Sequence, residues 1–143
     1  MEQKLINEIK GDLFESSDCL AHCVSRDFSM SAGIAVMFSK LFGNKDILLN
    51  QNVNVGEVAW LYNENRYIYY LVTKENYWNK PTYDAFRKSI RNLFILCNNH
   101  NIKSLSIPKL GCGLDRLEWT KVKQIIIEEW PIIKDFRINV YFI

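Results

Sequence analysis

The chain has 143 residues, of which 48% are hydrophobic and 24% charged, so we expect one folded domain over residues 1–143. Its 18 basic and 16 acidic residues give a net charge of +2, which argues against a protein that depends on tight duplex nucleic-acid binding. No apolar run reaches the roughly 18 residues of a membrane-spanning helix, so we expect no membrane partner.

The four cysteines, Cys19, Cys23, Cys97 and Cys112, are expected to be free thiols. The first residues lack the apolar core of a signal peptide, which predicts an intracellular location, nuclear or cytoplasmic. His22 lies between two of the cysteines, but no second pair of ligands stands at the spacing of a zinc site. We therefore expect neither a metal nor a cofactor.

The first half of the chain contains both strand and helix patterns. Residues 33–42 are predicted to be helical, since apolar residues recur there at intervals of three and four positions and Gly43 is suited to end the helix. The other expected elements are a strand over residues 4–9, a turn over 10–14, a buried strand over 19–24, a polar loop over 25–29 and a short helix over 45–51.

The second half carries the strongest strand signal, residues 66–73, which are rich in aromatic and β-branched side chains. This segment is expected to form a hairpin with residues 57–62. Pro81 precedes the longest predicted helix, as is common at helix starts. The remaining expected elements are a helix over residues 82–100, a strand over 104–108, a helix over 119–130 and a strand over 136–142. The pattern predicts an α/β fold.

A glycine-containing loop follows the predicted strand 104–108. Gly111 and Gly113 lack a Cβ, so they can adopt positive φ and bring backbone N–H groups close to an anion. Asp115 stands at the exit of the loop, where it suits either an acid/base group or a helix N-cap. Cys112 is expected to be a packed residue rather than a nucleophile, because the sequence places no histidine beside it.

Three of these segments are predicted to meet at one rim of the sheet. Strand 66–73, helix 82–100 and strand 104–108 form a βαβ unit, so the two strands should be parallel and Lys74 should lie near Asp115. If strand 19–24 is parallel as well, residues 31–33 bring a helix N-terminus to the same rim. Two such anion sites suit a diphosphate. A solvated lysine is the alternative for Lys74, while Lys80, Lys109 and Arg116 are expected from their positions to be surface charges.

At these residues the chain resembles a macrodomain, and more narrowly the terminal ADP-ribose protein glycohydrolase branch. The matching segments are residues 10–14, 20–25, 32–36, 56–59, 66–74, 80–83 and 108–119, and they cover nearly the whole length in order. The resemblance implies a three-layer α/β/α sandwich with a mixed central sheet.

The resemblance also implies a function: hydrolysis of mono-ADP-ribose from glutamate and aspartate side chains, together with deacetylation of O-acetyl-ADP-ribose. In that family the lysine at the position of Lys74 attacks the distal ribose, and the aspartate at the position of Asp115 is the acid/base. The implied ADP-ribose contacts are Asp12 and Leu13 near the adenine, then Ser25, Ser31, Ala32, Gly33, Ile34, Lys109, Leu110, Gly111, Cys112, Gly113, Leu114 and the C-terminal Ile143.

Ser31 departs from the family pattern, which usually has a glycine at this position of the first phosphate loop. Its side chain is expected either to crowd the loop and weaken affinity or to add a hydrogen bond to phosphate. A second class of function is a non-catalytic reader of ADP-ribose, which would have no need for Lys74 with Asp115. The expected partners are ADP-ribose, mono-ADP-ribosylated proteins, O-acetyl-ADP-ribose and ADP-ribosylated nucleic-acid ends. We expect a monomer.

Overall fold

The computed structural model describes residues 5–143, and the strands in this part of the chain form one sheet of order β1-β6-β5-β2-β4-β3. Strands β3 and β4 form the predicted antiparallel hairpin, and the other neighbouring strands are parallel, so the sheet is mixed. The strands are β1 (Leu5–Lys10), β2 (Cys19–Ser25), β3 (Val58–Asn63), β4 (Arg66–Lys74), β5 (Ser104–Ile107) and β6 (Arg137–Phe142).

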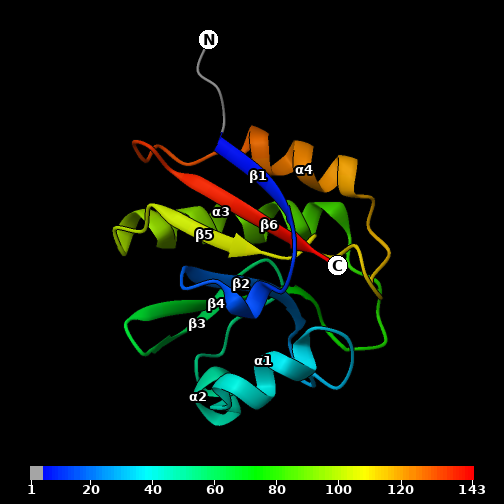
Figure 1. Cartoon of the computed structure of the whole chain (residues 1–143). Helices are drawn as coiled ribbons and strands as arrows, with labels where there is room; N and C mark the ends of the chain where they lie inside the picture. The colour runs from blue at the N-terminus through cyan, green and yellow to red at the C-terminus, as the bar shows by residue number, and fades with distance from the viewer. Residues whose placement is uncertain (1–4) are drawn as a thin grey trace.

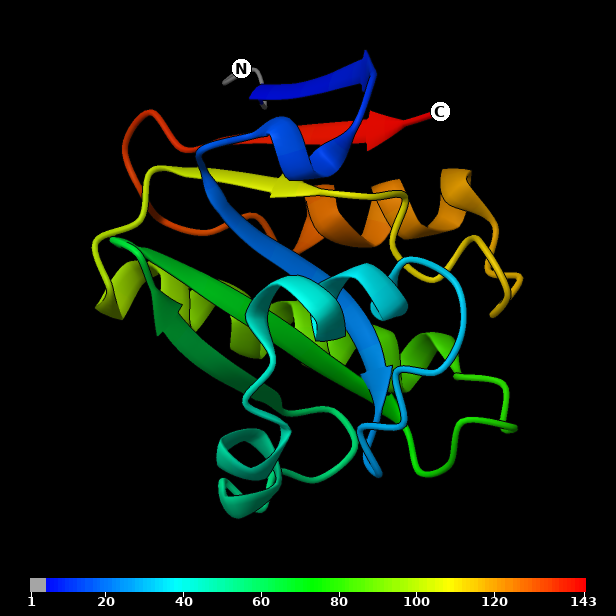
Figure 2. The same ribbon diagram turned by 60° about the horizontal axis from the view of Figure 1, so that its bottom comes forward.

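The helices cover both faces of the sheet (Figure 1). They are the short 3-10 helix η1 (Leu13–Glu15) and the α-helices α1 (Ala35–Phe42), α2 (Lys45–Asn50), α3 (Tyr83–Asn99) and α4 (Trp119–Glu128). In Figure 2, α1 and α2 lie in front of the sheet, whereas α3 and α4 lie behind it. The predicted three-layer α/β/α sandwich is therefore confirmed. Within residues 5–143 no helix is long and apolar enough to cross a bilayer.

Alternation along β4 divides the interior into two cores. Tyr69 and Leu71 point to the side of α3 and α4, where they join a cluster that includes Phe86. Tyr70 and Val72 belong to a second cluster on the side of α1 and α2. Successive strand side chains face opposite sides of a sheet, so a strand that is buried on both faces supplies both cores.

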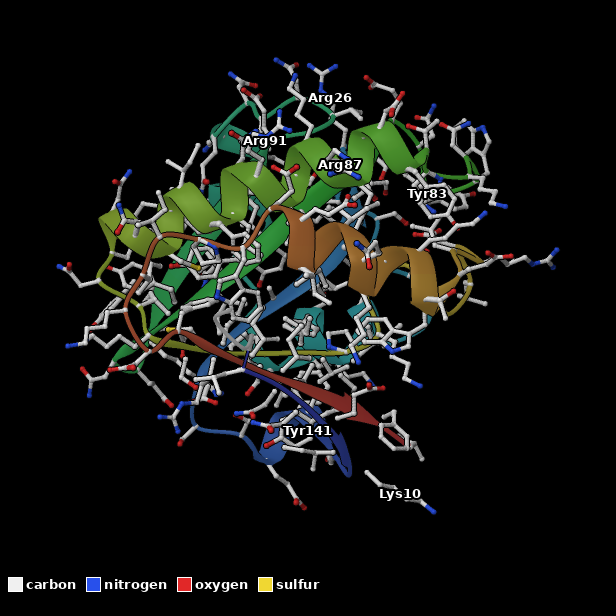
Figure 3. The ribbon with its side chains drawn as sticks, turned by 90° about the horizontal axis from the view of Figure 1, so that it is seen from above. Lys10, Arg26, Tyr83, Arg87, Arg91 and Tyr141 are labelled. Carbon is white, nitrogen blue, oxygen red and sulfur yellow. The ribbon has the colours of Figure 1, made fainter. Side chains whose placement is uncertain are left out.

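Helices α3 and α4 run side by side on the outer surface, with Arg87 and Arg91 on α3 (Figure 3). The Arg87 guanidinium contacts Glu128 at 2.7 Å and Glu129 at 2.8 Å, and Arg91 contacts Glu129 at 2.8 Å. Because these ion pairs are partly exposed, each stabilises the helix pair only slightly.

The observed elements follow the predicted ones with small shifts at their ends. Helix α1 begins at Ala35 rather than at residue 33, because Gly33 adopts a left-handed conformation with φ +63° that a helix does not accept. Strand β1 extends one residue beyond the predicted end, since Lys10 pairs with Phe142. Lys4, the predicted start of this strand, lies outside the described residues.

His22 on β2 is fully buried between the sheet and α1. Its ring stacks on Phe38 with centroids 3.7 Å apart and meets Tyr70 edge-on at 4.9 Å. Among the described residues, none supplies a hydrogen-bond partner to either ring nitrogen. Burial therefore lowers the pKa of His22 from its ordinary value of 6.5 to about 3, and the ring is neutral in the folded protein.

The glycine loop is shaped by Gly111, which has φ +69°. A Cβ at this position would lie 2.6 Å from Cδ1 of Leu117, and the Gly111 carbonyl accepts a hydrogen bond from the Leu117 N–H at 2.8 Å. Gly113 is different, since its φ is not in the left-handed region and a Cβ there would meet nothing within 4 Å. Of the two glycines that can adopt positive φ, only Gly111 does so.

The burial of the neutral His22 ring predicts that this residue makes the folding stability depend on pH. Because the folded pKa lies below the unfolded value, stability is fully present above pH 6.5 and is lost as the pH falls toward 3. Between pH 7 and pH 5, His22 should account for a loss of about 2 kcal/mol. Urea unfolding should show that His22→Phe lacks this part of the decline, and an unchanged pH slope in the variant would contradict it.

The loop geometry predicts opposite sensitivities for its two glycines. Gly111→Ala should reduce the free energy of unfolding by about 2–3 kcal/mol, because it combines a strained φ with overpacking against Leu117. Gly113→Ala is the matched control and should change the free energy by less than about 0.5 kcal/mol. Denaturant midpoints of the two variants measure the difference; equal midpoints would refute this account of the loop.

Candidate active site

The carboxyl ends of four parallel strands meet at one edge of the sheet. Strand β2 pairs in parallel with β4 on one side and with β5 on the other, and β5 pairs in parallel with β6. In Figure 2, the loops that leave β2 and β5 lie on the same side of the molecule as the end of β6. A cavity of about 990 Å³ opens along this edge. Such edges are the usual ligand sites of open α/β sheets.

Lys74 and Asp115 meet within this cavity. Lys74 is the last residue of β4, and its Nζ donates a hydrogen bond to Oδ1 of Asp115 at 2.5 Å and to the carbonyl of Tyr77 at 3.0 Å. The two charged side chains are only 12% and 18% exposed. Lys74, at the end of the first strand of the βαβ unit, and Asp115, at the exit of the glycine loop, are therefore in contact. Their places in the chain predicted that they lie near each other.

Asp115 does not cap a helix. Helix α4 begins at Trp119, and its N-cap residue is Glu118, whose side chain makes no capping hydrogen bond. The alternative of Asp115 as an N-cap is therefore wrong, and its carboxylate is available to Lys74 instead.

Two loops face each other across the cavity. The loop before α1 ends in Gly33, and the loop after β5 carries Leu114; a Cβ on Gly33 would lie 3.5 Å from Cδ1 of Leu114. At the start of α1 the N–H groups of Val36 and Met37 donate to the carbonyls of Gly33 and Ile34, at 3.2 and 3.1 Å, so the donors for an anion are the N–H groups of the loop ahead of them. Backbone N–H groups at such a helix start and in a glycine loop suit a phosphate anion.

The predicted site residues, with two exceptions, line this cavity. Those that line it are Lys74, Asp115, Ser25, Ser31, Ala32, Gly33, Ile34, Lys109, Leu110, Gly111, Cys112, Gly113, Leu114 and Ile143.

The exceptions are Asp12 and Leu13. The Asp12 carboxylate accepts a hydrogen bond from the Phe14 N–H at 2.9 Å and caps η1, while Leu13 is 3% exposed and lies in the core beneath α1. Both stand next to the β6 end of the cavity, because the Gly11 N–H donates to the Phe142 carbonyl at 2.8 Å. Their contact with a ligand stays a prediction.

Asp27 organises the polar loop that follows β2. Its Oδ1 accepts hydrogen bonds from the Ser25 hydroxyl and from the Ser29 N–H, the latter at 3.0 Å. Burial raises the pKa of the Asp27 carboxyl, but the hydrogen bonds from Ser25 and from backbone N–H groups outweigh it, so the pKa is lowered overall. Ser31 is exposed, and its hydroxyl lies 2.9 Å from that of Ser29. The Ser31 hydroxyl is thus placed on the open side of the first loop.

The two thiols of the cavity are unsuited to nucleophilic attack at neutral pH. Burial raises the pKa of Cys112 to about 11, and its Sγ donates to the Leu110 carbonyl at 3.3 Å. Burial also raises the pKa of Cys23 well above its ordinary range. All four cysteines are free. In the described part of the chain, no group of three or more His, Cys, Asp and Glu residues is arranged to hold a metal ion.

Sequence reasoning missed some of the residues that line the cavity. Tyr77 and Trp78 follow Lys74 closely in the chain, and both line the cavity with largely exposed side chains. Lys80 and Arg116 are exposed, as expected of surface charges, and they line the cavity as well. Their proximity to Lys74 and Asp115 in the sequence was the available signal.

Known proteins resemble this chain over nearly its whole length. The chain is 46% identical over 142 residues to the ADP-ribose glycohydrolase OARD1 of Homo sapiens and 48% identical to that of Bos taurus. Each of these alignments covers 98% of this chain and 93% of the relative.

Solved structures agree with the fold. The macrodomain of Thermus aquaticus DarG superposes with a TM-score of 0.86 at 22% identity, covering 99% of this chain and 100% of that one. Thermosipho africanus DarTG in complex with ADP-ribose gives 0.83 at 20% identity, covering 97% of this chain and 42% of that one. Residues 21–126 match the Macro domain family. Together with the geometry of the sheet edge, these similarities show that the chain belongs to the macrodomain family.

Proposed function

We propose that this protein is an ADP-ribose glycohydrolase that releases mono-ADP-ribose from glutamate and aspartate side chains of proteins. The relatives named ADP-ribose glycohydrolase support the activity, since they share 46–48% identity over nearly the full chain. The observation that carries the proposal is the contact between Lys74 and Asp115 inside the cavity. An amine beside a carboxylate is a suitable pair for attack and proton transfer at a glycosidic carbon.

In this proposal the two loops hold the diphosphate of the ligand. Residues 31–34 and 109–114 border the cavity from opposite sides, and both offer backbone N–H groups to an anion. Asp12, Leu13 and Ile143 stand at the β6 end, where we assign the adenine. The distal ribose then lies at the β4 end, next to Lys74.

The chemistry begins with a proton transfer from the Lys74 ammonium to Asp115. The neutral Nζ forms a bond to the anomeric carbon of the distal ribose, while the bond from this carbon to the acceptor oxygen breaks and the acceptor leaves as a carboxylate. Asp115 then gives its proton to the departing carboxylate, so that it can take a proton from a water that attacks the adduct. The carbon–nitrogen bond breaks, and the Lys74 amine recovers its proton from Asp115. We extend the proposal to O-acetyl-ADP-ribose, which presents an ester on the same ribose.

A reader of ADP-ribose is the alternative function. Binding requires the two loops but gains nothing from a largely buried ion pair, whose desolvation cost offsets much of its attraction. The Lys74–Asp115 contact therefore favours the hydrolase.

Lys74→Arg should lower the release of ADP-ribose from a glutamate-linked mono-ADP-ribosylated protein by roughly 1,000-fold or more, because a guanidinium stays protonated and cannot attack. ADP-ribose affinity should change by less than about threefold, since the charge beside Asp115 is kept. Lys123→Arg is the control, because Lys123 is also ion-paired, to Glu8 at 2.9 Å, and lies outside the cavity. Undiminished turnover in Lys74→Arg would eliminate the nucleophile assignment, and a wild type that only binds would be a reader.

Asp115→Asn should reduce turnover by about 100-fold or more, because the amide accepts no proton from lysine or water. If Asp115 helps to resolve the adduct, mass spectrometry of the intact variant under turnover should detect more of the chain carrying ADP-ribose on Lys74 than in the wild type. Asp46→Asn on α2 is the control for loss of one carboxylate. A full rate in Asp115→Asn would show that another group moves the proton.

A further inference from the structure

A turn with two exposed aromatic side chains directly follows Lys74. The Asn79 N–H donates to the Asn76 carbonyl at 3.0 Å, and the Asn76 N–H donates to Oδ1 of Asn79 at 2.9 Å. Tyr77 and Trp78 occupy the two central positions of this turn and are 57% and 67% exposed. Large aromatic rings contribute much binding free energy when a partner buries them. Because the turn is already hydrogen-bonded, its backbone loses little conformational entropy on binding.

The turn is connected to the reacting lysine on one side and to the loop after β2 on the other. The Tyr77 carbonyl accepts from Nζ of Lys74 at 3.0 Å, and the Tyr77 N–H donates to Oδ2 of Asp27 at 3.4 Å. Tyr77, Trp78 and Lys74 line the same cavity. The two rings are therefore held at a defined position beside the reacting amine.

The order of the strands tells which part of a substrate reaches the turn. From Ile143, at the end of β6, the cavity crosses β5 and β2 to Lys74 on β4. Adjacent strands are about 4.8 Å apart, so this path is about 14 Å long. An ADP-ribosyl group that reaches Lys74 with its distal ribose occupies the path, and its acceptor continues past β4. In Figure 2 the loop between β4 and α3 projects on that far side, away from the end of β6.

The chemistry of the turn favours a peptide as the acceptor. The Tyr77 and Trp78 rings are 5.0 Å apart and nearly perpendicular, at 87°, so they form a corner for side chains rather than a slot for parallel bases. Lys80 and Arg116 line the same cavity and add positive charge, whereas Glu75 is paired with Arg26 at 3.4 Å. A modified glutamate in an acidic segment complements this charge.

We propose that Tyr77 and Trp78 bind the acidic peptide segment that carries the ADP-ribosyl group, and so determine the preference for the acceptor. This inference rests on the proposed function, because it places the distal ribose at Lys74. The Tyr77 and Trp78 rings then contact the acceptor peptide, which leaves the ribose in the reaction, and the two backbone loops contact ADP-ribose.

The test compares a glutamate-linked mono-ADP-ribosylated acidic peptide with free ADP-ribose, using calorimetry. The Lys74→Arg variant serves as the background so that the peptide survives the titration. Adding Trp78→Ala or Tyr77→Ala should weaken binding of the peptide about 5- to 10-fold and change that of free ADP-ribose less than about twofold. Tyr62→Ala is the matched control, since Tyr62 is 58% exposed on β3 and lies outside this cavity. It should affect neither ligand.

Equal weakening of both ligands would overturn the inference, because the rings would then contact ADP-ribose itself. Unchanged affinity for both would also overturn it. A third titration uses a short ADP-ribosylated oligonucleotide. If the variants weaken binding of this ligand alone, the turn binds a nucleic-acid acceptor and the peptide assignment is wrong. Release of ADP-ribose by the wild type is measured separately: an inert wild type whose peptide affinity still depends on Trp78 would refute the hydrolase and keep the subsite.

Discussion

Strand β2 lies between β4 and β5 and runs parallel to both, and the whole site depends on this alignment. Parallel strands end at the same edge, so the loops after Ser25, Lys74 and Ile107 gather around one cavity although they are far apart in sequence. A reversed β2 would send the loop before α1 to the opposite edge. The buried faces of β2 on both sides of the sheet make its register costly to change, because a slip of one residue would exchange its two cores.

The Lys74–Asp115 ion pair has a structural role in the free protein and a chemical role in the proposed mechanism. In the free protein each charge satisfies the other within a mostly buried setting, which avoids the large cost of an unpaired buried charge. In the proposed mechanism, the same contact provides a short path for the proton that must leave the amine before attack. That mechanism requires substrate binding to separate the two groups enough for Nζ to reach carbon, and the second hydrogen bond of Nζ, to the Tyr77 carbonyl, holds the lysine near its position.

The cavity divides recognition between backbone and side chains. At the β5 and β2 ends, the glycine loop and the loop before α1 border the cavity, and backbone N–H groups in such loops suit phosphate because the fold fixes these donors. At the β4 end, the turn presents large aromatic rings and nearby cations instead. Under the proposed assignment, the backbone donors bind the diphosphate, which is the same in every substrate, while the exposed side chains bind the acceptor, which varies. This division follows from where each loop leaves the sheet.

Local sequence patterns determined the elements, since strand 66–74 and helix 83–99 have clear periodicities and start signals, and even their ends were predicted within one residue. The sequence also placed Lys74 and Asp115 at one rim, because a βαβ crossover makes parallel strands. Only the tertiary structure decided that β2 lies between β4 and β5, that Gly111 but not Gly113 needs a left-handed backbone, and that Lys80 and Arg116 border the cavity. The first of these features depends on contacts between segments far apart in the chain, and the glycine conformation depends on how Leu117 packs against Gly111. Local patterns carry no record of such contacts.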